Sequence, residues 1–247
     1  MVGTTKNRGF TLIEMSIVMV IIGLVIAAIT VAQGMVKQAN VRGAISEFTG
    51  LRTSITTFKL QFGYLPGDFN NAATIWPSAT CPSGLFPTGC NGNGNGIVDA
   101  VGGINGYEFY RAFQHLSLAG YVNGTYNGTA TQIDQYTSKY YAGGCYNLLS
   151  PGPTTFLALN NTSTSTLLEL GTWEGYHCDA ALIPTLDAYA IDTKLDDGNA
   201  KTGNLIGADG WYVSVGACSA GPSAVAGTGY YNLTTTGGVC TVRTVAD

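Results

Sequence analysis

The fold is decided by the stretch Arg8-Gly9-Phe10-Thr11-Leu12-Ile13-Glu14 and by the apolar run that follows it to about Ala32. The only charged residue in that run is Glu14. Roughly 20 apolar residues suffice to cross a bilayer as a helix, because each residue adds about 1.5 Å. The basic residues Lys6 and Arg8 precede the run. Basic flanks stay on the cytoplasmic side, so we expect the rest of the chain to lie outside.

Two common interpretations explain this run only in part. A secretory signal peptide has an apolar region of about 7–15 residues that ends at a cleavage site, and this run is longer and contains an acid. A plain membrane anchor explains the length but not Glu14, because a carboxylate inside a membrane helix costs about 2.5–3.5 kcal/mol. Cleavage between Gly9 and Phe10 would expose a charged α-amino group one helical turn from Glu14. That ion pair could form within one chain or between neighbouring chains, where it would fix their register.

The order of these features resembles the cleavage and methylation motif of type IV prepilins and type II secretion pseudopilins. The motif is carried by the charges of Lys6 and Arg8, by Gly9, Phe10 and Glu14, and by the long apolar helix. The resemblance implies that a prepilin peptidase cuts after Gly9 and N-methylates Phe10. It also implies that Glu14 meets the amine of a neighbouring subunit during filament assembly.

We therefore divide the chain into a leader at 1–9, a transmembrane and assembly helix at 10–33, an amphipathic half of that helix at 34–62, and a globular head at 63–247. No proline occurs before Pro66, so one helix can run from Phe10 through Phe62. After Lys37 the apolar residues follow steps of three and four, which predicts a helix face packed on the sheet of its own domain. This stripe comprises Val41, Ile45, Phe48, Leu51, Ile55, Phe58 and Phe62.

The composition of the head indicates a turn-rich β structure. The chain contains 34 glycines and only 11% charged residues, with many Asn, Thr and Tyr. We therefore predict an α+β fold in which the long amino-terminal helix packs on a loop-rich antiparallel β head, as in type IV pilins. Acidic residues outnumber basic ones in the head. This argues against a nucleic-acid partner, which calls for basic patches.

The cysteine pattern predicts disulfides in an oxidising compartment. All 6 cysteines lie in the head, and none forms the Cys-x-x-Cys pair that is typical of zinc sites. Six cysteines allow 15 pairings, and we expect each to pair with its nearest neighbour in sequence. The expected disulfides are Cys81–Cys90, Cys145–Cys178 and Cys218–Cys240.

Several segments of the head have recognisable patterns. Residues 107–118 read as a short helix with Phe109, Ala112, Phe113 and Leu116 facing the core and with a satisfied or exposed His115. A second helix is expected over 179–190, interrupted by Pro184. Leu167–Leu170 fits either a strand or a helix. Strands are expected at Gly144–Leu149, Thr155–Leu159, Trp211–Val215 and Val239–Val245.

Two loops are candidates for calcium. The run 91–99 alternates asparagine with glycine, but its leading ligands are amides and a site would need Asp99 and Glu108, so a tight glycine loop is favoured. The second candidate is the acidic segment of Asp187, Asp192, Asp196 and Asp197, for which a plain turn at 196–198 is the simpler interpretation. No other cofactor is expected.

No catalytic motif is present. The sequence lacks a Gly-x-Ser-x-Gly elbow, a Walker loop and a His-Glu-x-x-His pair. His177, Cys178 and Asp179 are consecutive, but adjacent side chains point apart and Cys178 is expected in a disulfide. We therefore expect a protein that is not an enzyme.

The favoured function is that of a structural subunit of a type IV pilus-like filament. The alternatives are a pseudopilin of a type II secretion system and a membrane-tethered adhesin or binding protein. Glu14 argues against the tip subunit that characteristically lacks this acid. The expected location is the bacterial inner membrane as a single-pass protein with a periplasmic head, followed by the pilus or pseudopilus. The expected partners are other pilin-like subunits, the prepilin peptidase and the membrane.

Overall fold

The computed structural model of the chain describes residues 9–76, 90–99, 108–128, 135–150, 165–210, 213–214, 216–220 and 229–246. The chain divides into two compact units, Met1–Asn40 and Val41–Asp247. The long helix α1 (Leu12–Phe62) contributes to both units.

Helix α1 is 51 residues long and has a defined stop signal. It ends at Gly63, which adopts a positive φ of 76° and donates its N–H to the carbonyl of Lys59 at 2.9 Å. A glycine in this conformation is the usual way to end an α-helix. The helix begins at Leu12 and not at Phe10 as predicted.

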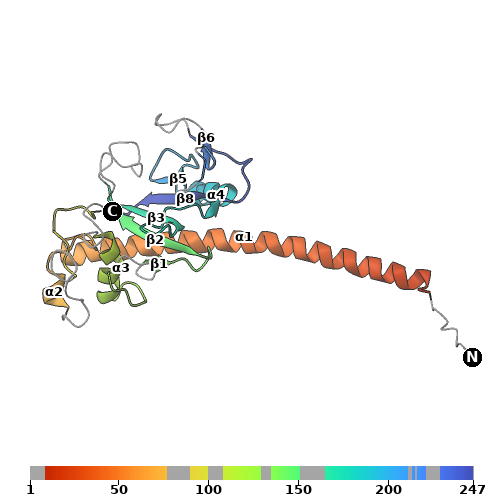
Figure 1. Cartoon of the computed structure of the whole chain (residues 1–247), viewed down its shortest axis with the longest axis horizontal. Coiled ribbons are helices and arrows are strands. Elements are labelled where there is room, and N and C mark those ends of the chain that lie inside the picture. The colour runs from red at the N-terminus through yellow and green to blue at the C-terminus, as the bar shows by residue number, and fades with distance from the viewer. Residues whose placement is uncertain are drawn as a thin grey trace, which may run out of the picture. The chain divides into compact units, whose positions relative to one another are not determined.

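The second half of α1 packs on the head through the predicted apolar stripe. Five members of the stripe are buried, and Ile45 and Phe62 pack against the same core. Phe48 meets the ring of Tyr146 edge-on, with centroids 5.2 Å apart. Since Tyr146 lies on strand β2 (Gly144–Leu149), the helix packs on the sheet of its own domain, and Figure 1 shows this half of α1 alongside β1 and β2. The predicted α+β fold is confirmed.

The main sheet is antiparallel and has the strand order β1-β2-β3-β8-β4, with β5 paired to β8. Strand β8 lies between β3 on one edge and β5 on the other, because residues 242–244 pair with both. Strands β6 and β7 form a separate two-stranded sheet. The remaining strand bounds are β1 Tyr136–Thr137, β3 Leu167–Thr172, β4 Ile183–Pro184, β5 Leu205–Asp209, β6 Ser219–Ala220, β7 Tyr230–Tyr231 and β8 Gly238–Val245.

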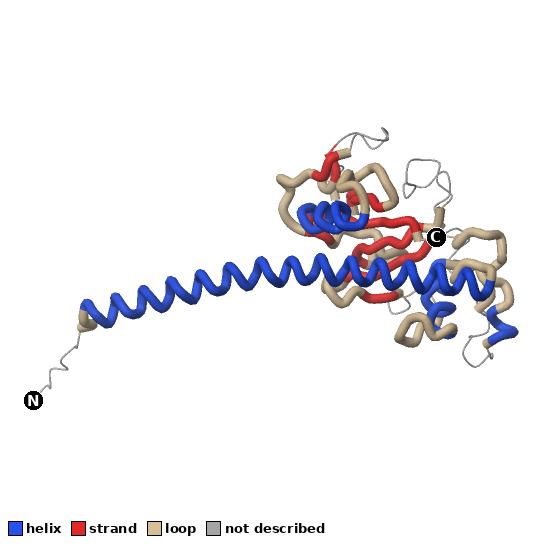
Figure 2. The backbone as a smooth tube through the Cα atoms, turned by 180° about the vertical axis from the view of Figure 1, so that it is seen from behind, coloured by secondary structure: helices blue, strands red, loops and turns tan. Residues whose placement is uncertain are grey.

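Three shorter helices complete the described elements, and Figure 2 shows them in blue. Helix α2 (Ala72–Ile75) is a single turn. Helix α3 (Phe109–Leu118) buries the four apolar residues predicted to face the core. Helix α4 (Thr185–Leu195) lies beside β5 and β8.

The second helix was predicted over 179–190, and this prediction is wrong in its bounds. Proline has no N–H, and it disfavours helical backbone in the residue before it. Pro184 therefore precedes α4 at the N-cap position, and no helix forms between Asp179 and Ile183. The segment before it instead bridges Ala180 to Thr172 and forms β4.

The strand predictions over 144–149 and 239–245 correspond to β2 and β8. The ambiguous segment Leu167–Leu170 belongs to strand β3. The strands expected at 155–159 and 211–215 lie outside the described residues, apart from positions 213 and 214.

His115 is buried and satisfied on both ring nitrogens. Its Nδ1 accepts the N–H of Gly67 at 2.9 Å, so its Nε2 must donate to the carbonyl of Cys90, 2.6 Å away. Burial lowers the pKa of His115 to about 4, which keeps the ring neutral. The prediction of a satisfied histidine is confirmed.

Two disulfides tie the sheet to its connections. They join Cys145 to Cys178 and Cys218 to Cys240. These are two of the three pairings expected from nearest neighbours in sequence. Cys81, and with it the third expected pairing, lies outside the described residues, and none of the described cysteines is a free thiol.

Candidate functional site

The start of α1 is closed by a reciprocal capping box. The N–H and the hydroxyl of Thr11 donate to Oε2 of Glu14 at 2.7 and 2.8 Å, and the N–H of Glu14 donates to the Thr11 hydroxyl at 3.3 Å. Such a box satisfies backbone groups that a helix start leaves without partners. This explains why α1 begins after Thr11, and it places the carboxylate of Glu14 beside the predicted cleavage point.

Gly9 and Phe10 lie just outside this box. Both are exposed, and neither is helical. The side chain of Phe10 is 80% exposed. Both residues that flank the predicted cleavage point are therefore exposed and non-helical in the single chain.

The first half of α1 presents an almost purely apolar surface. It is long and apolar enough to cross a membrane, and its most apolar window has no buried residue in the single chain. Two of its hydroxyl groups are hydrogen-bonded within the helix: Ser16 donates to the carbonyl of Ile13 and Thr30 to that of Ala27, both at 2.9 Å. In lipid every polar group must find such an internal partner. The segment therefore suits a bilayer or the apolar core of a filament.

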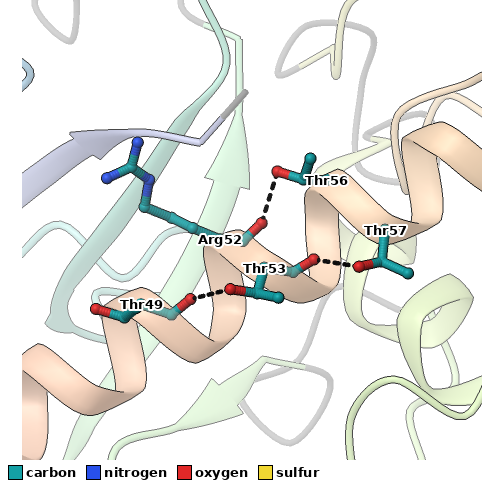
Figure 3. Close-up of a pocket in the computed structure, with 5 residues that line it drawn as sticks. All are labelled: Thr49, Arg52, Thr53, Thr56 and Thr57. Carbon is teal, nitrogen blue, oxygen red and sulfur yellow. Dashed lines mark hydrogen bonds between the residues drawn. The ribbon is translucent and has the colours of Figure 1, made fainter.

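A shallow groove of about 340 Å³ follows the exposed face of the second half of α1 (Figure 3). Arg52 and four threonines line it: Thr49, Thr53, Thr56 and Thr57. Each threonine hydroxyl donates to the carbonyl four residues earlier, at 2.7–2.9 Å. The groove therefore presents mainly methyl groups, and no reactive polar set converges there among the residues that the structure describes.

The candidate calcium loop at 91–99 is wrapped around two buried carboxylates. Asp68 accepts the N–H groups of Asn95 and Gly96, each at 2.9 Å. Glu108 accepts those of Asn93 at 2.6 Å and Asp99 at 3.1 Å. This arrangement matches the favoured interpretation of a tight loop, and sequence reasoning missed Asp68.

The two carboxylates at the centre of this loop, Asp68 and Glu108, lie in surroundings that disfavour their charged forms. Burial, and to a lesser degree the charges of Asp68 and Asp99, raises the pKa of Glu108 to about 7, although two backbone N–H donors act in the opposite direction. Burial also raises the pKa of Asp68. Calcium binding here stays a prediction.

The second candidate calcium segment is only partly brought together. Asp192, Asp196 and Asp197 place carboxylate oxygens within 4.8 Å of one another. Asp187 is not part of this group, and its carboxylate accepts the hydroxyl of Tyr141 at 3.1 Å. The predicted set of four is therefore reduced to three.

The three grouped acids already serve as hydrogen-bond acceptors. Asp192 accepts the N–H of Gly198 at 3.0 Å and the hydroxyl of Tyr231 at 2.8 Å. Asp196 accepts the N–H of Leu205 at 2.9 Å, and Asp197 accepts that of Asn199 at 2.8 Å. They organise the turn between α4 and β5, in line with the simpler interpretation, and calcium binding at this turn also stays a prediction.

Sequence reasoning missed Glu47, which anchors the long helix to the sheet. Its carboxylate accepts the hydroxyls of Ser138 at 2.8 Å and Tyr146 at 3.0 Å, and the N–H of Lys139 at 2.9 Å. Glu47 is buried beside Phe48, so its position next to the apolar stripe was the available signal. The capping box was also readable, from the Thr-x-x-Glu spacing of Thr11 and Glu14.

The long helix packed on an antiparallel sheet is an α+β arrangement like that of type IV pilins, and the amino terminus carries a separate sequence motif. The family model of the prokaryotic N-terminal methylation motif matches residues 4–30. This motif is the leader signature of type IV pilins and pseudopilins. No curated protein and no solved structure matches the chain.

Proposed function

We propose that the chain is a structural subunit of a type IV pilus-like filament. The observation that carries this proposal is the methylation motif at residues 4–30, placed directly before a helix with an exposed apolar surface. In this proposal a prepilin peptidase cuts after Gly9 and methylates Phe10. Before assembly the subunit is anchored in the inner membrane with its head in the periplasm. It then packs helix to helix with other subunits.

The capping box gives Glu14 two separable roles. Within its own chain, Glu14 accepts the hydrogen bonds from the N–H and the hydroxyl of Thr11 on the same oxygen, Oε2. An ionised carboxylate offers about four acceptor positions, so capacity remains for the amine of a neighbouring subunit. Capping requires only an oxygen acceptor, whereas pairing with an amine in an apolar filament core requires the negative charge.

The experiment compares three variants of the full chain in cells. Glu14→Gln keeps an acceptor suited to a capping box but removes the charge, Glu14→Ala removes both, and Thr11→Ala removes the cap while keeping the charge. If the charge sets assembly, both Glu14 variants lose incorporation into filaments while remaining in the membrane. Thr11→Ala should still be incorporated, with a loss of about 1 kcal/mol in helix stability.

The readouts are immunoblots of sheared filaments and of membranes, and mass spectrometry of the amino terminus. A mature chain that begins with methylated Phe10 supports the proposal. An intact Met1 on the protein from cells, or normal incorporation of Glu14→Gln, contradicts it. A tethered adhesin or binding protein would keep its function in all three variants.

The same fractionation, together with a deletion of the subunit, separates pilus from pseudopilus. A pilus subunit is recovered in the sheared extracellular fraction, and its deletion leaves protein secretion intact. A pseudopilin stays with the cell envelope, and its deletion stops secretion of exported proteins. The large cysteine-bearing head is unlike the small major pseudopilin, which favours a pilus subunit or a minor subunit.

A further inference from the structure

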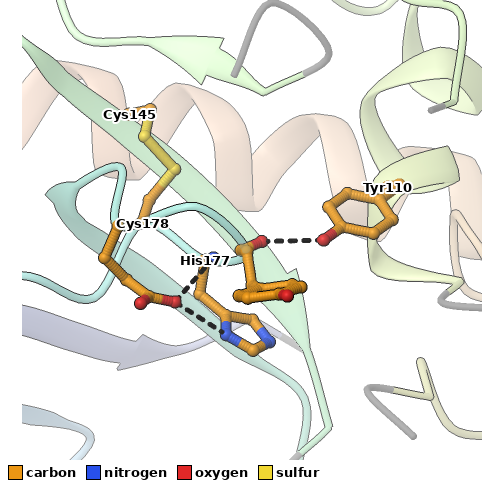
Figure 4. A network of polar contacts seen from close by, with 6 residues as sticks. Tyr110, Cys145, His177 and Cys178 are labelled. Carbon is orange, nitrogen blue, oxygen red and sulfur yellow. Dashed lines mark hydrogen bonds and ion pairs between the residues drawn. A yellow bond between two sulfur atoms is a disulfide. The ribbon is translucent and has the colours of Figure 1, made fainter. Parts of the chain in front are cut away.

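The turn after strand β3 is held in place from several sides. The N–H of Glu174 donates to the carbonyl of His177 at 3.0 Å, and the N–H of His177 donates back to Oε1 of Glu174 at 3.3 Å. The Cys145–Cys178 disulfide fixes the end of the turn to β2. The Tyr110 hydroxyl on α3 donates to the carbonyl of Tyr176 at 3.0 Å (Figure 4). The backbone that carries His177 is therefore preorganised.

Three potential metal ligands converge at this turn. Glu174, His177 and Asp179 each place a ligand atom within 4.8 Å of the other two. Nδ1 of His177 lies 3.6 Å from Oε1 of Glu174. That separation is too long for a hydrogen bond. It is close to the roughly 3.4 Å between two ligands of a tetrahedral zinc ion with bonds of about 2.0–2.1 Å.

One potential ligand atom of the cluster is buried and has no hydrogen-bond partner among the residues that the structure describes. It is Oδ1 of Asp179. Asp179 is only 7% exposed. A buried carboxylate oxygen without a donor is costly, and a bound cation removes that cost.

Two neighbouring groups shape the surroundings of the cluster. Arg243 directs its Nε to Oε1 of Glu169 at 2.5 Å, where it forms a separate ion pair. The imidazole of His177 stacks on the ring of Phe109, with centroids 4.9 Å apart, which restricts its orientation.

We propose that Glu174, His177 and Asp179 bind a divalent transition-metal ion of the zinc class. One imidazole nitrogen with two carboxylates is a ligand set for zinc and its neighbours, whereas calcium takes oxygen ligands alone. Three protein ligands leave one tetrahedral position for water. The ion would join the turn to the start of the following segment, beside the Cys145–Cys178 disulfide.

The acidic cluster at the α4–β5 turn differs from this one in its hydrogen bonds and in its ligand types. There the oxygens of Asp192, Asp196 and Asp197 accept backbone or hydroxyl donors. No nitrogen ligand belongs to that group. It therefore provides a matched set of carboxylates that should not bind zinc in the same way.

The test measures zinc binding to the full chain in detergent micelles. The protein is purified without a histidine tag, stripped with a chelator and titrated with Zn²⁺ against a chromogenic competitor. We expect one zinc ion per chain and a rise in the melting temperature of the head. The absence of stoichiometric binding by the wild-type chain overturns the proposal.

Matched variants assign the ligands. His177→Gln should weaken zinc binding by at least about 10–100-fold, the loss typical of disturbing even an outer partner of a metal site. Asp197→Asn, an exposed change in the other cluster, should bind zinc like the wild type. Glu174→Gln tests the carboxylates if the buried Asp179→Asn does not fold. Wild-type affinity in His177→Gln, or equal binding of Ca²⁺ that competes with Zn²⁺, contradicts the assignment.

Discussion

At the scale of single residues, the head contains a buried ion pair that joins two neighbouring strands. Glu169 on β3 and Arg243 on β8 occupy directly opposed positions. Nε of Arg243 lies 2.5 Å from Oε1 of Glu169, and both side chains are buried. Burial raises the pKa of Glu169 to about 7, against the lowering effect of the guanidinium. A buried pair of this kind is sensitive to loss of one partner.

We predict that Arg243→Met destabilises the head by about 3–5 kcal/mol, because it leaves Glu169 buried without a counter-charge. The double variant Glu169→Leu/Arg243→Met should recover much of that loss, since no lone charge remains. Urea unfolding of the full chain in detergent, followed by near-UV circular dichroism, measures both. A double variant no more stable than the single one would refute this account.

Glu108 provides a pH prediction. Its pKa is raised from 4.5 to about 7, so the folded chain holds a proton that the unfolded chain releases between these values. The associated stability is present below about pH 4.5 and is lost as the pH rises through 7. Glu108→Gln stays neutral, so the stability of the wild type relative to this variant should fall between pH 5 and pH 8, by at most about 2.5 kcal/mol and by less where solvent screens the carboxylate.

The measurement is a set of urea unfolding curves for both proteins at several pH values. Glutamine also loses one of the two backbone donors that Glu108 satisfies, which lowers the stability of the variant at every pH. The informative quantity is therefore how the difference in unfolding free energy between the wild type and Glu108→Gln changes with pH. A difference that stays constant from pH 5 to pH 8 would show that Glu108 does not titrate as proposed.

At the scale of elements, α1 contains glycines in contrasting surroundings. A Cβ atom added to Gly43 would lie 2.2 Å from Cε1 of Tyr140, whereas one added to Gly50 would meet nothing within 4 Å. Gly43 is buried and Gly50 is exposed. Glycine therefore permits the close approach of Tyr140 at one position and has no such role at the other.

We predict opposite effects of the same substitution in this helix. Gly50→Ala should stabilise the chain by about 1 kcal/mol, because alanine favours a helix interior over glycine. Gly43→Ala should destabilise it by about 1–3 kcal/mol, because its methyl group displaces the ring of Tyr140. Thermal unfolding of the unassembled chain measures the stability of both variants. Adding Tyr140→Ala to Gly43→Ala should recover the stability that Gly43→Ala loses. Equal effects at both positions would show that the ring moves aside freely.

At the scale of the whole molecule, covalent links supplement a sheet with several short strands. The Cys145–Cys178 disulfide spans 33 residues and includes the β2–β3 connection, and Cys218–Cys240 spans 22. Links that close such loops stabilise mainly by restricting the unfolded chain. The head therefore depends on an oxidising compartment, which agrees with the proposed export.

We predict that Cys145→Ser/Cys178→Ser lowers the stability of the head by about 3–4 kcal/mol. Cys218→Ser/Cys240→Ser should cost slightly less, because its loop is shorter. Urea unfolding of each double variant, with the wild type under reducing conditions as a reference, measures the cost. Wild-type stability after reduction would mean that the disulfides are dispensable.

The sequence by itself determined the amino-terminal motif, the apolar run, the buried stripe of α1 and the glycine that ends it. These features are local or periodic: a helix repeats every 3.6 residues, and Gly63 supplies its stop signal from within the same segment. A polar residue read alone does not reveal its partner. Glu169 and Arg243 are 74 residues apart in sequence, and Glu47 and Tyr146 are 99 apart. Only the tertiary structure decided these pairs, because each depends on how elements distant in sequence pack. The convergence of Glu174, His177 and Asp179 needed the structure for another reason, since it depends on the backbone conformation of a single turn.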